Sequence, residues 1–185
     1  MDMTEKKISS RLHYSGRIIK VYNDEILDPA GNTAYREYCR HPGGICVVPI
    51  TDQGEVLLVR QYRYPYGEEV VEIPAGKRDS ATENPEEGGR RELREELGAE
   101  AEHFIPLGIF YPTPGYTDEV LYMYAATGLT FGEASPDEGE FVEPLRYHID
   151  TLTDMIMKGE IRDGKTQTAV LKVKHLLDRG EIKLK

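Results

Sequence analysis

Residues 76–99 read GKRDSATENPEEGGRRELREELGA, and the second half of this stretch carries the strongest helix signal in the chain. Asn84 is a suitable N-cap, Pro85 suits the first helical position, and Glu87 lies three residues after the cap, as in a capping box. Gly98 is placed to end the helix. The pattern therefore predicts a helix between Asn84 and Gly98.

Two glycines, Gly88 and Gly89, stand inside this predicted helix. Each should cost about 1 kcal/mol relative to alanine. We therefore expect tertiary packing, rather than intrinsic propensity, to hold the helix.

Acidic and apolar residues occupy different faces of the same helix. Residues three and four positions apart are neighbours on a helix, so Glu92, Glu95 and Glu96 form one cluster while Leu93 and Leu97 form an apolar pair. Such carboxylates repel one another, and a divalent cation bound between them would make their net interaction favourable. Magnesium binds through one or two carboxylates plus substrate phosphates. The helix can thus pack and bind metal, although an acidic face taken alone is also typical of a solvated surface.

The composition fits one globular domain with a small appendage, because 39% of the 185 residues are hydrophobic and 30% are charged. No apolar stretch approaches the roughly 20 residues of a membrane helix, and the polar start predicts no signal peptide. Cys39 and Cys46 form no CxxC or Cys/His pattern, so we expect reduced thiols in a cytoplasmic protein. A net charge of −10 argues against nucleic acid as a partner. A small anion would have to be met by metal ions or a few placed arginines.

Short β-type runs, separated by turn-rich pieces, flank the helix. Two further amphipathic helices are expected near Leu152–Lys158 and Thr166–Arg179. The turn at residues 51–54 predicts a hairpin that joins the runs Ile45–Ile50 and Val56–Arg60. Strands interrupted by a few helices indicate a mixed α/β sandwich. The runs are Arg17–Tyr22, Ala34–Cys39, Ile45–Ile50, Val56–Arg60, Val70–Ile73, Phe104–Tyr111, Val120–Ala126 and Phe141–His148.

The spacing of the charged residues in 76–99 resembles the Nudix box, which reads Gly, five residues, Glu, seven residues, Arg-Glu-apolar, any, Glu-Glu, any, Gly, apolar. In this chain six residues separate Gly76 from Glu83, and seven separate Glu83 from Arg91. The extra residue lies in a loop and should not move the helix carboxylates, but it leaves the role of Glu83 open. The final apolar position is the small Ala99.

This resemblance implies a Nudix α/β/α sandwich with a mixed sheet over residues 43–185. A small antiparallel β segment at residues 1–42 would precede it and pair with its counterpart in a homodimer. The implied activity is hydrolysis of a nucleoside diphosphate linked to another moiety, with Mg2+ or Mn2+ as the cofactor and two or three ions per site.

The resemblance also assigns roles in the helix. Glu92, Glu96 and the carbonyl of Ala75 would be metal ligands, and Glu95 would be a further ligand or would support the others. Arg91 would orient the glutamates. The plainer alternative for Arg91 is a surface ion pair with a glutamate one turn away.

Pro114 comes fifteen residues after Ala99 and belongs to a Pro114-Gly115-x-x-x-Glu119 pattern. This looks like the marker of the ADP-ribose pyrophosphatases within the Nudix family. There the loop lines the pocket of the terminal ribose, and Glu119 would help to hold substrate. A simple turn before a strand is the alternative.

An acidic loop at residues 137–140 follows, in the kind of position where catalytic loops often occur. Similar enzymes take a water-activating glutamate and a metal ligand from this loop. We favour Glu138 as the general base and Glu140 as the metal ligand, and the reverse assignment stays open. The alternative is an acidic surface loop.

Arginine side chains suit a diphosphate because the guanidinium group can meet phosphate oxygens in bidentate fashion. Arg63 matches the position at which related enzymes contact phosphate, and Arg36 is a second candidate. The family typically pairs its N-terminal strands across a dimer, so Tyr35–Tyr38 could complete the adenine site of a neighbouring subunit. These aromatic residues would also suit an ordinary strand.

These expectations combine into Mg2+-dependent hydrolysis of ADP-ribose to AMP and ribose 5-phosphate. Pyrophosphatase activity on another nucleoside diphosphate sugar, such as GDP-mannose, is one alternative. A non-catalytic ADP-ribose sensor on the same fold is another, although such proteins usually lack box glutamates that this chain retains.

Overall fold

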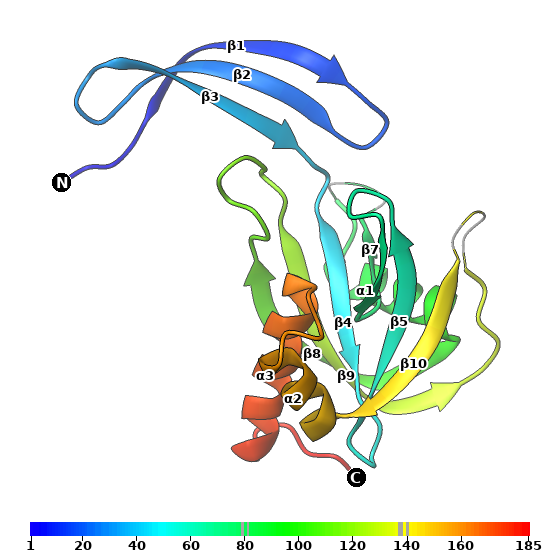
Figure 1. The fold of residues 1–185 in the computed structure, drawn as a ribbon. Coiled ribbons are helices and arrows are strands. Elements are labelled where there is room, and N and C mark those ends of the chain that lie inside the picture. The colour runs from blue at the N-terminus through cyan, green and yellow to red at the C-terminus, as the bar shows by residue number, and fades with distance from the viewer. Residues whose placement is uncertain (79, 81, 137–138, 140) are drawn as a thin grey trace. The chain divides into compact units, whose positions relative to one another are not determined.

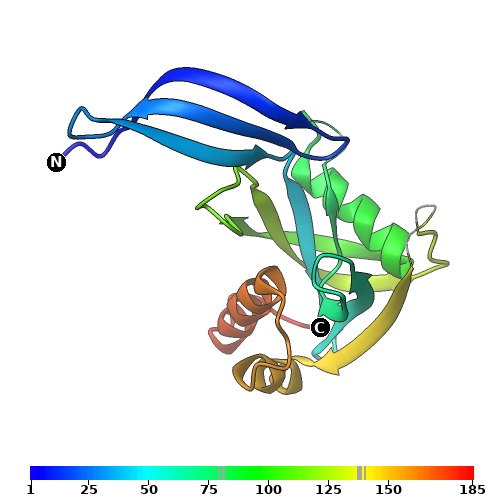
Figure 2. The same ribbon diagram turned by 45° about the horizontal axis from the view of Figure 1, so that its top comes forward.

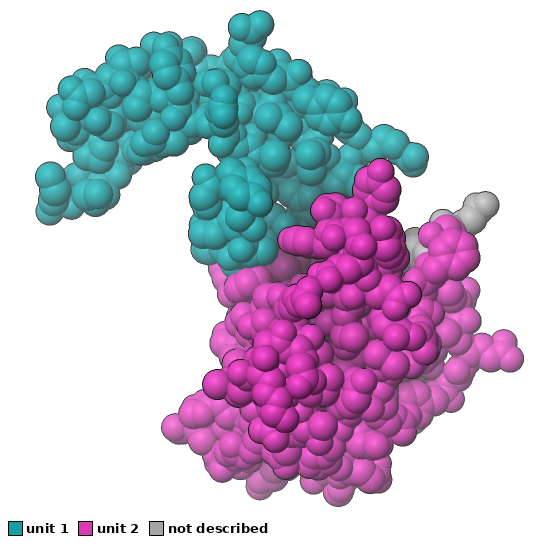
Figure 3. Space-filling view, viewed as in Figure 1, with its two compact units in different colours: residues 1–43, 111–120 teal, residues 44–110, 121–185 magenta. Residues whose placement is uncertain are grey.

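The computed structural model describes residues 1–78, 80, 82–136, 139 and 141–185. These residues group into two compact units (Figure 3). Unit 1 comprises Met1–Gly43 and Tyr111–Val120, and unit 2 comprises Gly44–Phe110 and Leu121–Lys185. The loop predicted to bind substrate therefore belongs with the N-terminal segment. The division into an N-terminal β segment at 1–42 and one domain at 43–185 stays a prediction.

The described part of unit 1 contains an antiparallel sheet with the strand order β1-β2-β3 (Figure 1). The strands are β1 at Lys6–Ser15, β2 at Lys20–Leu27 and β3 at Thr33–Arg40. Tyr22 and Tyr38 face each other across β2 and β3 with ring centroids 5.7 Å apart, and the Arg40 guanidinium lies 5.3 Å from the Tyr22 ring. The predicted N-terminal antiparallel segment is thus confirmed.

Strand β1 has no counterpart among the predicted runs. All ten of its residues are exposed, so its sequence lacks the apolar pattern of a buried strand. Ile8, Leu12 and Tyr14 nevertheless recur at even spacing in the sequence, although bulges between Lys7 and Ser9 and between Leu12 and Tyr14 interrupt the pairing of β1 with β2. That alternation is the signal that could have predicted it.

The described residues of unit 2 form two sheets with the orders β7-β4-β9-β8 and β10-β5-β6. Strand β4 runs parallel to β9, whereas the other ladders are antiparallel, so the first sheet is mixed. This confirms the predicted fold class. The strands are β4 Gly44–Pro49, β5 Glu55–Arg63, β6 Glu68–Glu72, β7 Ala75–Lys77, β8 Ala99–Phe110, β9 Leu121–Phe131 and β10 Val142–His148.

The prediction of a hairpin between the runs Ile45–Ile50 and Val56–Arg60 is wrong. Strands β4 and β5 are consecutive, but they belong to different sheets and share only the isolated bridge between Ile50 and Val56 among the described pairings. Every residue of β4 is buried, and this strand is paired on both edges by β7 and β9. A strand occupied on both edges has no edge left for a hairpin partner, so the turn carries the chain to the second sheet.

Helices cover both faces of the mixed sheet, as Figure 2 shows. The helix α1 (Pro85–Leu97) packs on one face, where Leu93 joins Val47, Ala99 and Ala126 in a buried cluster. The helices α2 (Ile149–Met157) and α3 (Gly164–Asp178) cover the other core, which contains Val48, Leu58, Met123, Leu152 and Val170. Residues of β4 therefore alternate between two cores, which is the α/β/α layering expected.

Gly88 and Gly89 let α1 approach the sheet closely. A Cβ atom at Gly88 would lie 2.8 Å from Ile45 Cδ1, and one at Gly89 would lie 3.1 Å from both Ile45 Cγ2 and Phe104 Cε1. Tertiary packing thus holds the helix, as its sequence indicated. Among the helices of the described residues, none is long and apolar enough to cross a membrane.

Candidate active site

The ends of α1 are fixed by the predicted caps. The Asn84 side chain accepts a hydrogen bond from the Glu86 amide at 2.9 Å, which satisfies a first-turn donor. Gly98 adopts the left-handed conformation with φ 60°, which glycine tolerates best. A Cβ atom at Gly98 would also lie 2.6 Å from the Gly132 carbonyl oxygen. The helix therefore begins and ends in a defined register, and so do its glutamates.

The three predicted glutamates divide into a buried pair and a half-buried partner. Glu92 and Glu96 lie one turn apart and are only 7% and 4% exposed. Glu95 is half-buried and turns toward Arg91, with Arg91 Nη1 2.9 Å from Glu95 Oε2. The pair Glu92 and Glu96 therefore forms the oxygen-rich centre of the site.

Arg91 lies among three carboxylates. Its Nη1 atom is 2.8 Å from Glu92 Oε1, and its Nη2 atom is 3.5 Å from Glu83 Oε1. Nη2 also donates to the Lys77 carbonyl at 3.2 Å. Arg91 therefore has more than the single surface pair with Glu95, and its contacts suit the orienting role predicted for it.

Glu83 reaches the helix although one extra residue precedes it. Its carboxylate contacts Arg91, and its carbonyl accepts a hydrogen bond from Arg78 Nη2 at 2.7 Å. Its side chain is mostly buried, and its Cδ atom lies 3.2 Å from where a Cβ of Gly88 would stand. The longer loop thus leaves the Glu83 side chain beside α1.

Gly76 explains how a carboxylate and a backbone strand come so close. A Cβ atom at this position would lie 1.8 Å from Glu92 Oε1, so any side chain here would require the Glu92 carboxylate to move. The neighbouring Ala75 pairs with Cys46 in the β4–β7 ladder. The strand that carries the predicted Ala75 carbonyl ligand is therefore packed directly against Glu92.

A buried charge cluster near Arg63 was not predicted. Arg63 donates to both carboxylate oxygens of Glu72, at 2.5 and 2.7 Å, and Lys165 pairs with the same carboxylate. Burial favours the neutral acid, but the hydrogen bond from Arg63 and the positive charges of Lys165 and Arg63 outweigh it and lower the pKa of Glu72. The sequence signal was a lone glutamate in the apolar run Val70–Ile73.

Helix α3 presents Lys165 to this cluster. Its N-cap Asp163 lies 3.0 Å from Lys165 Nζ and accepts a hydrogen bond from the Thr166 amide at 2.9 Å. Thr166 Oγ1 in turn accepts from the Ile73 amide at 2.9 Å. The start of α3 is thereby tied to the end of β6, so Lys165 is held at Glu72.

The candidates Arg36, Pro114, Gly115 and Glu119 lie in unit 1. Arg36 pairs with Glu5 and also donates to the Tyr35 carbonyl. Glu119 Oε1 lies 3.3 Å from His41 Nδ1, a contact that the sequence did not suggest. Pro114 and Gly115 are exposed.

Glu138 and Glu140 fall outside the described residues. The segment before them is fixed at the end of α1, because the Gly132 amide donates to the Gly98 carbonyl at 2.7 Å and the Ser135 amide donates to the Glu95 carbonyl at 3.0 Å. The chain therefore enters the acidic loop from the end of the glutamate helix.

A family model of the NUDIX domain matches residues 40–166. The chain belongs to the Nudix family. The predicted resemblance and the class of Nudix hydrolase are thereby confirmed.

Two relatives align with nearly the whole of this Nudix chain. A methanol dehydrogenase activator of Bacillus methanolicus is 40% identical over 168 residues, which cover 90% of each chain. An ADP-ribose pyrophosphatase of Bacillus subtilis (strain 168) is 35% identical over 170 residues, which cover 91% of each. The crystal structure of an ADP compounds hydrolase shares the Nudix fold with a TM-score of 0.83, at 20% identity over 98% of this chain and 100% of that one.

The chemistry of the Nudix site suits a divalent cation. Among the described residues, no group of three or more histidine, cysteine, aspartate or glutamate side chains is placed to hold a metal ion by itself. Glu92 and Glu96 offer two buried carboxylates, and that of Glu92 lies beside the backbone of Gly76. Magnesium needs no more than one or two carboxylates when water and phosphate supply the remaining oxygens. The residues present therefore fit such an ion.

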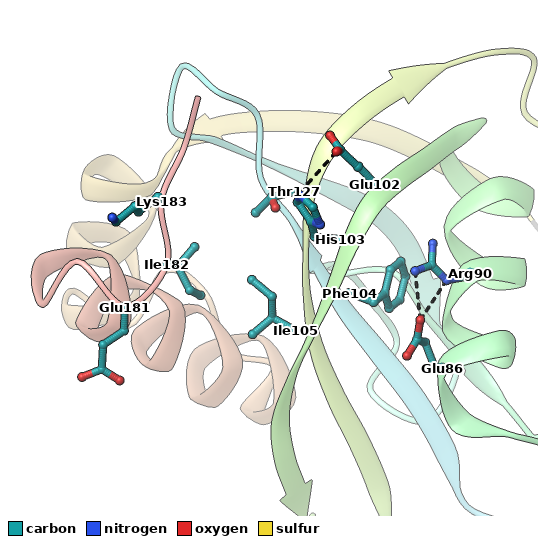
Figure 4. A pocket seen from close by; sticks show the side chains of 10 residues that line it. All are labelled: Glu86, Arg90, Glu102, His103, Phe104, Ile105, Thr127, Glu181, Ile182 and Lys183. Atoms are coloured by element: carbon teal, nitrogen blue, oxygen red, sulfur yellow. Dashed lines mark hydrogen bonds and ion pairs between the residues drawn. The ribbon is translucent and has the colours of Figure 1, made fainter.

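A hollow of about 630 Å3 lies elsewhere on the Nudix fold, between β8, the first turns of α1 and the C-terminal residues (Figure 4). Within it, Arg90 pairs with Glu86 and lies 4.3 Å from the Phe104 ring. Its described lining shares no member with the predicted site. The carboxylate helix, not this hollow, is therefore the candidate active site.

Proposed function

We propose that this Nudix hydrolase is an ADP-ribose pyrophosphatase that hydrolyses the diphosphate bond of ADP-ribose to give AMP and ribose 5-phosphate. The observation that carries the proposal is the buried pair Glu92 and Glu96, of which Glu92 lies beside Gly76, in a chain 35% identical to an ADP-ribose pyrophosphatase. The pattern Pro114-Gly115-x-x-x-Glu119 supports ADP-ribose as the substrate.

The cofactor in this proposal is Mg2+, with two or three ions per site. Glu92, Glu96, Glu140 and the Ala75 carbonyl would hold them, and Arg91 and Glu95 would orient the ligands. When bound, the ions would neutralise charge on the diphosphate and lower the pKa of a water molecule. Glu138 would accept the proton of the water that attacks phosphorus.

Substrate binding in this proposal depends on groups outside the carboxylate helix. Arg63 and Arg36 would donate to the diphosphate or its adenosine half, and Pro114, Gly115 and Glu119 would contact the terminal ribose. Arg63 is bidentate to Glu72 and about two fifths exposed, so its guanidinium is both oriented and accessible. An oriented guanidinium loses less entropy when it meets a phosphate.

We further propose that the protein is a cytoplasmic homodimer. Its N-terminal strands would form the subunit contact. The support is the exposure of Ile8, Leu12 and Tyr14 on β1, because exposed apolar groups of this kind often mark protein contacts.

Release of AMP from ADP-ribose with Mg2+ tests the catalytic assignment. Glu96→Gln and Glu138→Gln should each lower the rate by about a hundredfold or more, since each removes a charge that acts at the reacting phosphate. Glu100→Gln is the matched control, because Glu100 is exposed and pairs only with Arg94 among the described residues. Removal of metal with EDTA should abolish AMP release. Near-normal rates in both site variants would contradict the assignment.

The alternatives are separated by a substrate panel. GDP-mannose and other nucleoside diphosphate sugars are assayed beside ADP-ribose, and the highest kcat/KM identifies the substrate. A sensor would bind ADP-ribose tightly and turn over none of it with any divalent metal.

A second candidate function is activation of an alcohol-oxidising dehydrogenase. The observation that favours it is the 40% identity to the methanol dehydrogenase activator over 90% of both chains. The test adds this protein to a methanol dehydrogenase assay. Activation by the wild-type protein and by Glu96→Gln alike would indicate a binding role, whereas loss in Glu96→Gln would make activation a consequence of hydrolysis.

A further inference from the structure

The loop predicted to hold the terminal ribose is built onto the end of β3. The Cys39 amide donates to the Tyr116 carbonyl at 2.8 Å, and the Asp118 amide donates to the Cys39 carbonyl at 3.1 Å. Cys39 and Thr117 thereby form a parallel bridge. The backbone of this loop is therefore fixed to β3, and the residues that follow β3 can control the side chains of the loop.

His41 is the residue that reaches those side chains. Its amide donates to Asp118 Oδ1 at 2.9 Å, and its Nδ1 atom lies 3.3 Å from Glu119 Oε1. The two side chains are 15% and 26% exposed, so both are largely withdrawn from water. A hydrogen bond from this nitrogen to the carboxylate would be stronger at such a partly buried position than on an open surface.

The same imidazole nitrogen closes a turn. The Gly43 amide donates to His41 Nδ1 at 3.1 Å, and Gly43 has φ 84°, a conformation that favours glycine. One ring nitrogen cannot accept from Gly43 and donate to Glu119 at the same moment. The turn and the carboxylate are therefore both within reach of a single atom of His41.

We propose that His41 is a positioning residue for substrate recognition, which acts by orienting the Glu119 carboxylate toward the hydroxyl groups of the terminal sugar. A carboxylate has two oxygens, so Oε1 can face His41 while the other accepts from a sugar hydroxyl. A fixed carboxylate favours a ribose whose hydroxyls match its position, and it loses little entropy on binding. The inference rests on the proposed function, in which Glu119 contacts substrate.

Three substitutions at one position separate the turn from the carboxylate. His41→Asn retains an acceptor for the Gly43 amide, in the manner of an Asx turn, and adds an amide donor for Glu119. His41→Asp retains the acceptor but places a negative charge against Glu119. His41→Ala removes both contacts. A residue that only shaped the turn would make His41→Asn and His41→Asp equivalent.

Steady-state kinetics with ADP-ribose give the first readout. His41→Ala and His41→Asp should raise KM about tenfold and change kcat less than about threefold, because the contact acts on binding rather than on chemistry. His41→Asn should stay near the wild-type KM. His175→Ala is the matched control, since His175 is an exposed histidine on α3. Equal KM values for His41→Asn and His41→Asp would overturn the proposal.

A double-mutant cycle shows whether His41 acts through Glu119. Glu119→Gln should raise KM, and adding His41→Ala to it should raise KM by less than about twofold more, because coupled residues are not additive. Full additivity of the two effects would mean that His41 acts by another route.

Amide hydrogen exchange gives a readout that does not depend on turnover. The amides of Asp118 and Glu119 should exchange faster in His41→Asp than in His41→Asn, because repulsion loosens the loop. A wild-type protein that fails to cleave ADP-ribose would refute the proposed function, and the exchange experiment would still decide the role of His41. Equal exchange in the two variants would overturn that role.

Discussion

At the scale of single residues, the site depends on the absence of a side chain at Gly76. The Glu92 carboxylate occupies the space that any Cβ atom there would need. Glu92 is buried and contacts Arg91 in this position, so a displacement of its carboxylate would disturb that contact. The glycine thus leaves room for the Glu92 oxygen that we propose as a metal ligand.

Gly76→Ala should lower kcat/KM for ADP-ribose by about tenfold or more, because a displacement of about 1 Å in a catalytic group is enough for a large loss. The weaker binding of Mg2+ should appear as a higher metal concentration for half-maximal rate. Gly164→Ala is the control, since its Cβ atom would meet only Phe110 Cζ, at 3.9 Å. Unchanged metal dependence in Gly76→Ala would show that Glu92 can move without harm.

Local spacing predicted the residues of α1 well, because the helical repeat alone places Glu92 beside Glu96 and Leu93 beside Leu97. It could not predict Glu72 and Lys165, which lie far apart in sequence and meet only when α3 packs onto the end of β6. The contact between His41 and Glu119 was missed for the same reason. Residues that act across distant segments leave no periodic signal.

At the scale of elements, the packing of α1 on β4 opposes its own helix propensity. Alanine at Gly88 would favour the helix by about 1 kcal/mol. Its Cβ atom would, however, lie 2.8 Å from Cδ1 of Ile45, which is completely buried. The steric conflict with the sheet therefore competes with the gain in helix stability.

Gly88→Ala should lower the free energy of unfolding by about 1 kcal/mol, since overpacking a filled core typically costs more than the propensity gained. Ile45→Val removes the clashing Cδ1 atom and should make the same change neutral or stabilising. Urea denaturation of the two single variants and the double variant measures the coupling. Additive effects would show that Ile45 does not limit the approach of α1.

Propensity and turn signals predicted most strands but not their partners. The run Ile45–Ile50 was predicted as a strand and corresponds to β4. The expected hairpin with β5 does not form, because both edges of β4 are already paired, with β7 and with β9. Choice of partner depends on which edges the whole fold leaves open, and a local turn does not contain that information. Strand β1 was missed because its apolar residues are separated by charged and polar ones and are exposed.

At the scale of the whole molecule, a net charge of −10 requires that an anionic substrate be met by localised positive charge. In the described residues, Arg63 is the proposed source of such charge, since Lys165 is held between Glu72 and Asp163, and the proposed metal ions would supply it at Glu92 and Glu96. Recognition therefore depends on a few fixed groups rather than on a basic surface.

Unit 1 should hold two copies of the chain together through its exposed apolar residues. Leu12 is 49% exposed on β1, and a charge at this position should disfavour burial against a partner. Sedimentation equilibrium should give twice the chain mass of 21.0 kDa for the wild-type protein, and a mass near 21.0 kDa for Leu12→Asp. Ile109→Asp is the control, because Ile109 is 51% exposed on β8 of unit 2. If the N-terminal strands also complete the adenine site of a neighbour, Leu12→Asp should raise KM for ADP-ribose and leave metal dependence unchanged. A dimeric Leu12→Asp protein, or a monomeric wild-type protein, would place the subunit contact elsewhere or remove it.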